Sequence, residues 1–171
     1  MASESFSSPD KKYGPSYAEA LREGLHIEPS KEEEINRIEM DFDGWHKDKY
    51  DLSVPVTLPD GRQVPKVPAA DVWLVRDVLF IGRVSVRQRL NENLEKYGGH
   101  IGYAVRASER RKGYGGLLMK EGLRVARTFG LKKVLLTCND DNMASIRLIE
   151  KAGGVLQDKI SVLNRPVLHR R

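Results

Sequence analysis

The segment best suited to chemistry is a run of three basic residues followed by closely spaced glycines. Arg110, Arg111 and Lys112 precede Gly113-Tyr114-Gly115-Gly116, and an amphipathic helical pattern begins directly afterwards. Glycines let phosphate oxygens approach the main chain, and the first turn of a helix offers unpaired backbone N–H groups to an anion. The pattern therefore predicts a diphosphate-binding loop.

Two better-known phosphate loops do not match this segment. A Walker A loop needs four residues between its first glycine and a Gly-Lys-Ser/Thr, which does not occur here. A dinucleotide fingerprint needs Gly-x-Gly-x-x-Gly, but Gly113-x-Gly115 continues as Gly116-Leu117-Leu118. A helix that simply begins with glycines and solvated basic residues is the alternative interpretation.

The same loop resembles the Arg/Gln-x-x-Gly-x-Gly/Ala signature of the GNAT superfamily of acyl-CoA-dependent N-acyltransferases, with Arg110, Gly113 and Gly115 in the signature places. The strand-like run 135–138 and the helical run 142–153 resemble the next strand and helix of that family. The resemblance covers roughly residues 70–160. Within the family, the chain looks similar to a bacterial branch of predicted acetyltransferases.

This resemblance implies that the chain uses acetyl-CoA and acetylates a primary amine of a small molecule or a protein by direct attack in a ternary complex. The pantetheine arm would pair with the strand backbone around Tyr103 to Arg106, in a gap where this strand and the next parallel strand splay apart. The implied cofactor-binding residues are Ala104, Val105, Arg106, Arg110, Arg111, Lys112, Gly113, Tyr114, Gly115, Gly116, Asn142 and Ser145.

The catalytic positions depart from the family's pattern. His100 stands where many members carry a glutamate base, and an imidazole with a pKa of about 6.5 accepts protons at neutral pH. A histidine that only hydrogen-bonds a loop is the alternative. Ile149 stands where a tyrosine often acts as the acid, so Tyr103 or water would protonate the leaving thiolate. A non-catalytic acyl-CoA-binding sensor module is therefore the alternative function.

Other reactive side chains give weaker signals. Cys138 is the only cysteine, which excludes an intramolecular disulfide, and a buried structural role is favoured over a nucleophilic one. The four histidines are scattered, so no metal site is expected. Trp45 and Tyr50 are candidates to line an acceptor pocket, whereas Trp73 is expected in the core.

Charge is distributed unevenly along the chain. The net charge is +5, yet residues 1–50 hold 12 acidic and 7 basic side chains, while residues 83–133 hold 13 basic and 4 acidic ones. A basic zone favours a nucleic acid, an acidic surface or a nucleotide cofactor. Aromatic residues are not interleaved with the basic ones, so no nucleic-acid partner is expected. Short apolar runs and the lack of a secretory signal predict a cytoplasmic protein with no membrane partner.

Hydrophobic periodicity and turn residues predict an α+β fold with a mixed sheet, in which an antiparallel portion and one parallel crossover are flanked by helices. The resemblance implies that the sheet is mostly antiparallel and that its one parallel strand pair is splayed. The predicted elements are helices at 17–25 and 30–42, strands at 72–75, 80–86 and 100–105, a helix at 114–129, a strand at 133–138, a helix at 143–152, and strands at 155–162 and 166–171. Residues 1–16 are predicted to form a flexible tail and residues 17–171 a single N-acetyltransferase domain. The proline-rich stretch 51–70 predicts a long loop with a short hairpin. The last strands suggest pairing across a homodimer.

Overall fold

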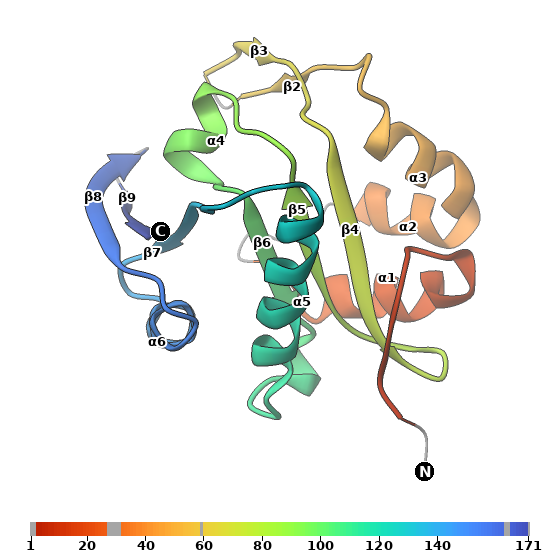
Figure 1. The fold of residues 1–171 in the computed structure, drawn as a ribbon. Helices are drawn as coiled ribbons and strands as arrows, with labels where there is room; N and C mark the ends of the chain where they lie inside the picture. Colours follow the sequence, from red (N-terminus) through yellow and green to blue (C-terminus); the bar gives the residue numbers. More distant parts are fainter. Residues whose placement is uncertain (1–2, 27–31, 59, 163–164, 171) are drawn as a thin grey trace. The chain divides into compact units, whose positions relative to one another are not determined.

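A computed structural model of the chain describes residues 3–26, 32–58, 60–162 and 165–170 (Figure 1). The chain forms two compact units whose segments alternate along the sequence. The first unit comprises residues 1–54, 71–84 and 103–118, and the second comprises residues 55–70, 85–102 and 119–171. That residues 17–171 act as a single domain stays a prediction.

A four-stranded sheet carries the strand that leads into the glycine loop. Its order is β1 (Ser5–Ser7), β4 (Ala69–Arg76), β5 (Leu79–Arg87) and β6 (Ile101–Val105). β4 and β5 are joined by two residues, the first of which, Asp77, has a φ of 53° as a tight hairpin requires. Arg87 N donates to His100 O and Arg106 N donates to Ile81 O, each over 2.8 Å, so β5 and β6 run antiparallel.

The N-terminal residues differ from the predicted flexible tail 1–16. Strand β1 pairs antiparallel with β4, so that Ser5 lies opposite Val75. Asp10 then accepts a hydrogen bond from Lys12 N and begins a 3-10 turn, η1, at Lys11–Tyr13. The ring of Tyr13 is buried in the core. A three-residue edge strand and one buried ring produce no periodic pattern, which is why composition alone predicted a tail.

Three helices cover one face of β4 and β5 (Figure 1): α1 (Gly14–Arg22), α2 (Glu32–Met40) and α3 (Phe42–Tyr50). Their apolar side chains form a core with the strands. The core includes Tyr17, Ile35, Ile38, Phe42, Trp45, Trp73 and Phe80. The buried position of Trp73 confirms its expected core role. The predicted start of the helix at 30–42 lies outside the described residues.

Helix α5 (Tyr114–Thr128) follows a 3-10 turn, η2, at Ala107–Glu109 and begins where the sequence predicts. Gly130, with a φ of 75°, ends it as expected. The first turns of α5 approach the sheet closely at Gly82. A Cβ atom on Gly82 would lie 2.7 Å from Ala104 O and 2.9 Å from Leu118 Cδ1, so only glycine fits there.

The second unit is built around a three-stranded antiparallel sheet. The sheet order is β7 (Leu136–Asn139), β9 (Arg165–Arg170) and β8 (Leu156–Val162), and the other elements are α4 (Glu92–Tyr97), α6 (Met143–Lys151), β2 (Val56–Thr57) and β3 (Gln63–Val64). β2 and β3 form the short hairpin predicted in the proline-rich stretch. Asn142 caps α6, as predicted.

Strand β9 pairs with β7 along one edge and with β8 along the other. The last strand is thus paired on both edges within the chain, and a homodimer stays a prediction. β6 and β7 lie in different sheets. The residues that directly precede these two strands are hydrogen-bonded, since His100 N donates to Leu135 O over 2.7 Å. Gly99 permits this contact, because its φ is 62° and a Cβ atom would lie 2.4 Å from Leu135 O.

The predicted α+β class is confirmed, since antiparallel sheets are flanked by helices throughout the described part of the chain. Within that same part, no helix has the length and apolar character needed to cross a membrane.

Candidate functional site

The glycine loop has a backbone suited to anion binding. Arg111 and Gly113 adopt the left-handed conformation, with φ angles of 64° and 87°, and α5 begins at the next residue. Gly113 has no side chain with which to cap the helix, and the first turn of α5 contains no acidic residue. Gly116 N donates to Gly113 O over 3.0 Å. The earlier N–H groups of this turn and the positive end of the helix dipole are suited to bind an anion.

The space around the loop is open. A Cβ atom added to Gly113 or Gly116 would meet no described atom within 4 Å. Arg111 and Lys112 are exposed beside these glycines. Packing does not account for glycine at either position, so backbone conformation and room for a ligand are the remaining physical reasons.

Arg110 holds the loop against its neighbours. Its Nε donates to Val105 O over 3.1 Å, at the end of β6, and a terminal nitrogen donates to Gly24 O over 2.8 Å, after α1. The signature arginine therefore fixes the loop to β6 and to the segment after α1. Arg110 was predicted to contact the cofactor, and these bonds give it a positioning role.

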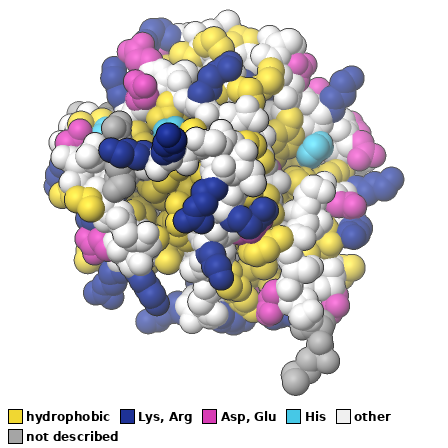
Figure 2. Space-filling view, viewed as in Figure 1, with side chains coloured by type: hydrophobic (Ala, Val, Ile, Leu, Met, Phe, Trp, Pro, Cys, Tyr) yellow, Lys and Arg dark blue, Asp and Glu magenta, His cyan; other side chains and the backbone are white. Residues whose placement is uncertain are grey.

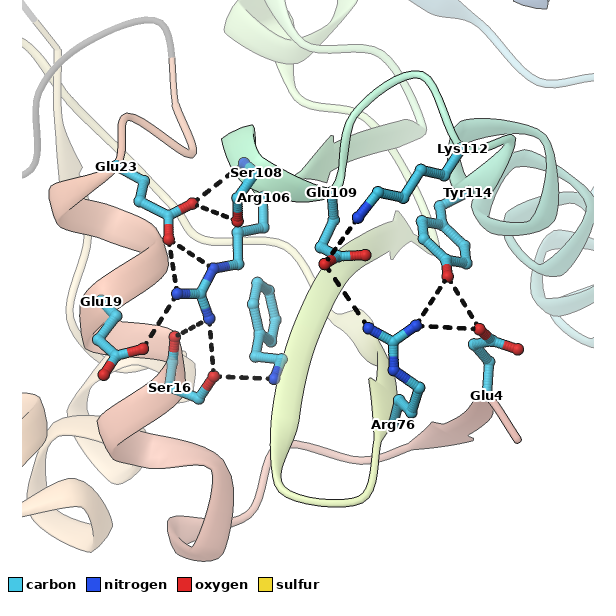
Figure 3. Close-up of polar contacts among 11 residues, drawn as sticks. Glu4, Ser16, Glu19, Glu23, Arg76, Arg106, Ser108, Glu109, Lys112 and Tyr114 are labelled. Atoms are coloured by element: carbon cyan, nitrogen blue, oxygen red, sulfur yellow. Dashed lines mark hydrogen bonds and ion pairs between the residues drawn. The ribbon is translucent and has the colours of Figure 1, made fainter. Parts of the chain in front are cut away.

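Arg106 makes the most extensive polar contacts of the site (Figure 3). Its buried guanidinium donates to Glu23 over 2.5 Å, to Glu19 over 3.0 Å and to Ser16 Oγ over 2.9 Å. Its backbone N–H donates to Ile81 O. The sequence prediction that Arg106 contacts the cofactor does not fit this geometry, because its side chain and its N–H both bind protein groups.

Glu23, which accepts hydrogen bonds from Arg106, has a strongly lowered pKa. The hydrogen bond from Arg106 lowers the pKa of Glu23 to about 2, against the opposing effect of burial and with help from Ser108. Ser108 donates both its N–H and its hydroxyl to the same carboxylate. The turn that precedes the glycine loop is thus tied to α1 through one ionised acid.

A second network joins the N-terminal residues to the loop (Figure 3). Tyr114 OH donates to Glu4 over 2.8 Å and accepts from Arg76 over 3.2 Å. Glu109 lies 3.0 Å from Lys112 and 3.6 Å from Arg76 in ion pairs. Glu4, Arg76 and Glu109 were not predicted as site residues, and neither their spacing nor their local pattern distinguishes them.

Glu109 is a buried carboxylate inside a loop that should bind an anion. One of its oxygens, Oε2, is buried without a hydrogen-bond partner among the described residues. Its ion pairs with Lys112 and Arg76 offset its negative charge, so the loop keeps its basic character. Figure 2 shows Lys and Arg side chains spread over the viewed face with acidic ones among them.

Strand β6 is an edge strand of its sheet. Because His100 and Arg106 bond to β5, the alternation of an antiparallel ladder turns the backbone of Ala104 toward β5 as well. The backbone groups of Tyr103 and Val105 then face the other edge, where no described strand pairs with β6. Of the predicted strand residues, Val105 can offer its N–H to an extended ligand, whereas its carbonyl oxygen already accepts from Arg110 Nε. The backbone of Ala104 and that of Arg106 face β5.

His100, Asn142 and Ser145 belong to the second unit, and the other predicted site residues belong to the first. His100 Nδ1 accepts a hydrogen bond from Leu135 N over 2.9 Å. A neutral imidazole has one acceptor nitrogen, so this bond favours the loop-bonding role for His100. Asn142 Oδ1 accepts from Ser145 N over 3.1 Å, which uses that oxygen as the cap of α6.

Ile149 and Cys138 have surroundings that agree with the non-catalytic character expected of them. Ile149 is buried and apolar, so it cannot donate a proton. Burial raises the pKa of Cys138, with Arg170 opposing the shift. A thiol that stays protonated at neutral pH is a poor nucleophile, which agrees with the structural role expected for Cys138.

Tyr114→Phe should weaken the loop while keeping its packing. The substitution removes the hydroxyl that joins Glu4 to Arg76 and leaves the ring in place. We expect a loss of about 1 kcal/mol in the free energy of unfolding and an acetyl-CoA Kd raised about threefold to tenfold. Urea unfolding and calorimetric titration measure both. Unchanged values of both would show that the N-terminal residues do not support the loop.

Comparison with known proteins identifies the class. Residues 33–154 match the model of the acetyltransferase (GNAT) family. The chain belongs to the GNAT family of acetyltransferases. Among curated proteins, no sequence is significantly similar to it.

Solved structures share the fold at low sequence identity. The yncA protein of Salmonella typhimurium, solved with its cofactor acetyl-CoA, is 15% identical with a TM-score of 0.61, over 98% of this chain and 91% of that chain. An N-acetyltransferase of Staphylococcus aureus Mu50 is 13% identical with a TM-score of 0.61, over 99% and 97%. The ribosomal-protein-S18-alanine N-acetyltransferase of Escherichia coli is 12% identical with a TM-score of 0.61, over 98% and 92%. The likeness is one of fold.

Proposed function

We propose that this acetyltransferase moves an acetyl group from acetyl-CoA to a primary amine of a small molecule or a protein. The observation that carries the proposal is the uncapped start of α5, where the left-handed Gly113 leaves first-turn N–H groups to an anion. Family membership supports the acetyl donor, and the acetyl-CoA in yncA of Salmonella typhimurium supports it at the level of the fold.

The described residues fit the donor in two places. The N–H groups of the loop from Arg111 to Gly116 would hold the diphosphate, with the exposed charges of Arg111 and Lys112 beside them. The outer edge of β6, through the N–H of Val105, would pair with the extended amide arm. Acetyl-CoA supplies a thioester carbonyl already activated toward an amine. The loop and the edge of β6 would bind the donor and orient its thioester toward the amine. Such positioning contributes strongly to the rate of a transfer between two bound reactants.

Proton transfer rests on few groups. Tyr103 is the predicted proton donor for the leaving thiolate, since Ile149 is apolar. For the attacking amine, Nδ1 of His100 is not available as the acceptor, because Leu135 N–H donates to it. We therefore assign His100 a positioning role at the start of β6, and water takes the amine's proton.

A pair of variants separates these roles for His100. His100→Asn places an amide oxygen near the position of Nδ1 and can still accept from Leu135 N–H, whereas His100→Ala leaves that N–H without its acceptor. We expect the asparagine variant to keep kcat within about threefold and the alanine variant to lose about tenfold. Measurement of kcat between pH 6 and pH 9 checks this. An equal, large loss in both variants, with a flattened pH profile, would identify His100 as the base.

A non-catalytic acyl-CoA-binding module is the second candidate. The buried Ile149 and the occupied Nδ1 of His100 favour it, since both usual proton-transfer positions lack a reactive group. The two candidates agree on donor binding and differ only in turnover.

The test combines binding with turnover. Calorimetric titration with acetyl-CoA should give saturable binding, and a DNA duplex titrated in parallel should give none. Release of free CoA thiol is then measured with polyamines, lysine peptides and peptides that begin with alanine. Thiol release that depends on an amine supports the enzyme. Binding without amine-dependent release supports the sensor, and the absence of binding contradicts both.

A further inference from the structure

The helical side of the first unit contains a lysine surrounded by aromatic rings. Lys49 Nζ lies 4.5 Å from the ring centroid of Trp45 and 5.8 Å from those of Tyr17 and Tyr50. Tyr17 and Trp45 are buried, and Lys49 itself is half-buried near the end of α3. The amine is therefore largely removed from bulk water while part of the side chain stays accessible.

A buried ion pair lies beside this amine. Arg83 donates to Asp71 over 3.0 Å, and the Asp71 side chain is 2% exposed. Tyr50 OH donates to the other carboxylate oxygen of Asp71, and Arg83 also donates to Tyr17 OH over 3.4 Å. The charge of Asp71 is thus largely satisfied by Arg83, and the positive charge of Arg83 acts on Lys49.

Two other titratable groups act on the same amine. Glu34 accepts from the Trp45 indole over 3.2 Å, and His26 interacts with both Lys49 and Arg83. Burial and then Arg83 lower the pKa of Lys49 to about 7, against the opposing effects of Asp71 and Glu34. A lysine amine in water has a pKa of about 10.4, so the neutral form of Lys49 is far more populated near pH 7.

We propose that Lys49 is an acetylation site, at which the neutral amine takes an acetyl group from an activated donor, either a thioester or an acyl phosphate. The Nζ lone pair attacks the donor carbonyl, an N–C bond forms as the C–S or C–O bond breaks, and the amine proton goes to water. The leaving thiolate or phosphate takes the electron pair of the broken bond. The product amide is uncharged, so its formation removes the repulsion between Lys49 and Arg83.

Lys47, two residues earlier on the same helix, is the internal control. It is exposed, and no aromatic ring surrounds its ammonium in the described part of the chain. A lysine amine in water is about 0.1% neutral at pH 7.4. Exposure alone would therefore favour Lys47, whereas the environment of the amine favours Lys49.

The test is site-resolved acetylation of the native protein at pH 7.4 by isotopically labelled acetyl phosphate, and separately by labelled acetyl-CoA. We expect initial labelling of Lys49 to exceed that of Lys47 at least about tenfold. The Lys49 rate should level off above about pH 7. In urea, where the surrounding rings disperse, the preference should disappear. Lys49→Arg confirms the peptide assignment.

The two donors separate the sources of the acetyl group. A Lys49 preference with either donor supports the proposal, and the donor that gives it identifies the source. Labelling of Lys49 no faster than that of Lys47 with both donors would overturn it. The acetyl phosphate arm does not use the glycine loop, so failure of the proposed acetyl-CoA function leaves that arm unaffected.

Discussion

Replacement of Gly113 by valine should raise the Kd for acetyl-CoA at least about 100-fold. Gly113 has a φ of 87°, a conformation that costs an L-residue about 1–2 kcal/mol and a β-branched residue more. The added methyl groups would also project into the open space beside the first-turn N–H groups. Loss of two charge-assisted hydrogen bonds, at about 1.5–3 kcal/mol each, accounts for an effect of this size.

Gly130→Val is the matched control for this substitution. Gly130 also has a positive φ, 75°, and a Cβ atom there would meet nothing within 4 Å, but it lies at the far end of α5. Both variants should lose similar thermal stability, and only the Gly113 variant should lose affinity. Calorimetric titration of both variants with acetyl-CoA, at the same ionic strength, measures the difference in affinity. Equal affinity in the two variants would mean that the glycine loop is only a helix start.

The loop could be predicted from the sequence because its signal is local. Three basic residues, glycines at 113, 115 and 116, and an amphipathic run fall within a few residues of one another. The structure adds the backbone angles of Arg111 and Gly113. The positive φ of residue 113 explains why that residue is a glycine. Helix caps at Asn142 and Gly130 were predictable for the same reason.

The supports of the loop could not be predicted, because they join residues far apart in sequence. Tyr114 and Glu4 are separated by 110 positions, and Arg106 and Glu23 by 83. An isolated glutamate in a serine-rich segment resembles any solvated residue. The protein contacts of Arg106 could not be predicted for the same reason, since a basic residue before a phosphate loop suggests a ligand when its acidic partners are unknown.

The surroundings of Lys49 also depend on residues far apart in sequence, so they could not be predicted either. The sequence suggested Trp45 and Tyr50 as aromatic residues near a site, but it could not show that Tyr17, from another helix, lies beside the same amine. Nor could it show that Arg83, on a strand, pairs with Asp71 there. The reactivity of a lysine depends on the dielectric of its surroundings. For Lys49 these surroundings form only when α1, α3, β4 and β5 pack together.

Arg106→Gln should cause a loss of stability that depends on pH. The pKa of Glu23 is about 2 in the folded protein and about 4.3 in an unfolded chain. A lowered carboxylate pKa contributes stability above the unfolded value, and this stability disappears as pH falls from about 4.3 to about 2. The shift corresponds to about 3 kcal/mol, which partial exposure of Glu23 reduces to about 1–2 kcal/mol.

Without Arg106, Glu23 loses the group that lowers its pKa, so the variant lacks this pH-dependent contribution. Urea unfolding of the wild type and Arg106→Gln at pH 7, 5 and 3 should show a gap that is constant from pH 7 to 5 and narrows at pH 3. Glu19→Gln is the control, because Glu19 contacts the same guanidinium but its side chain is 62% exposed. It should change stability by less than about 1 kcal/mol. A gap between wild type and Arg106→Gln that stays the same down to pH 3 would show that Arg106 acts through packing rather than through Glu23.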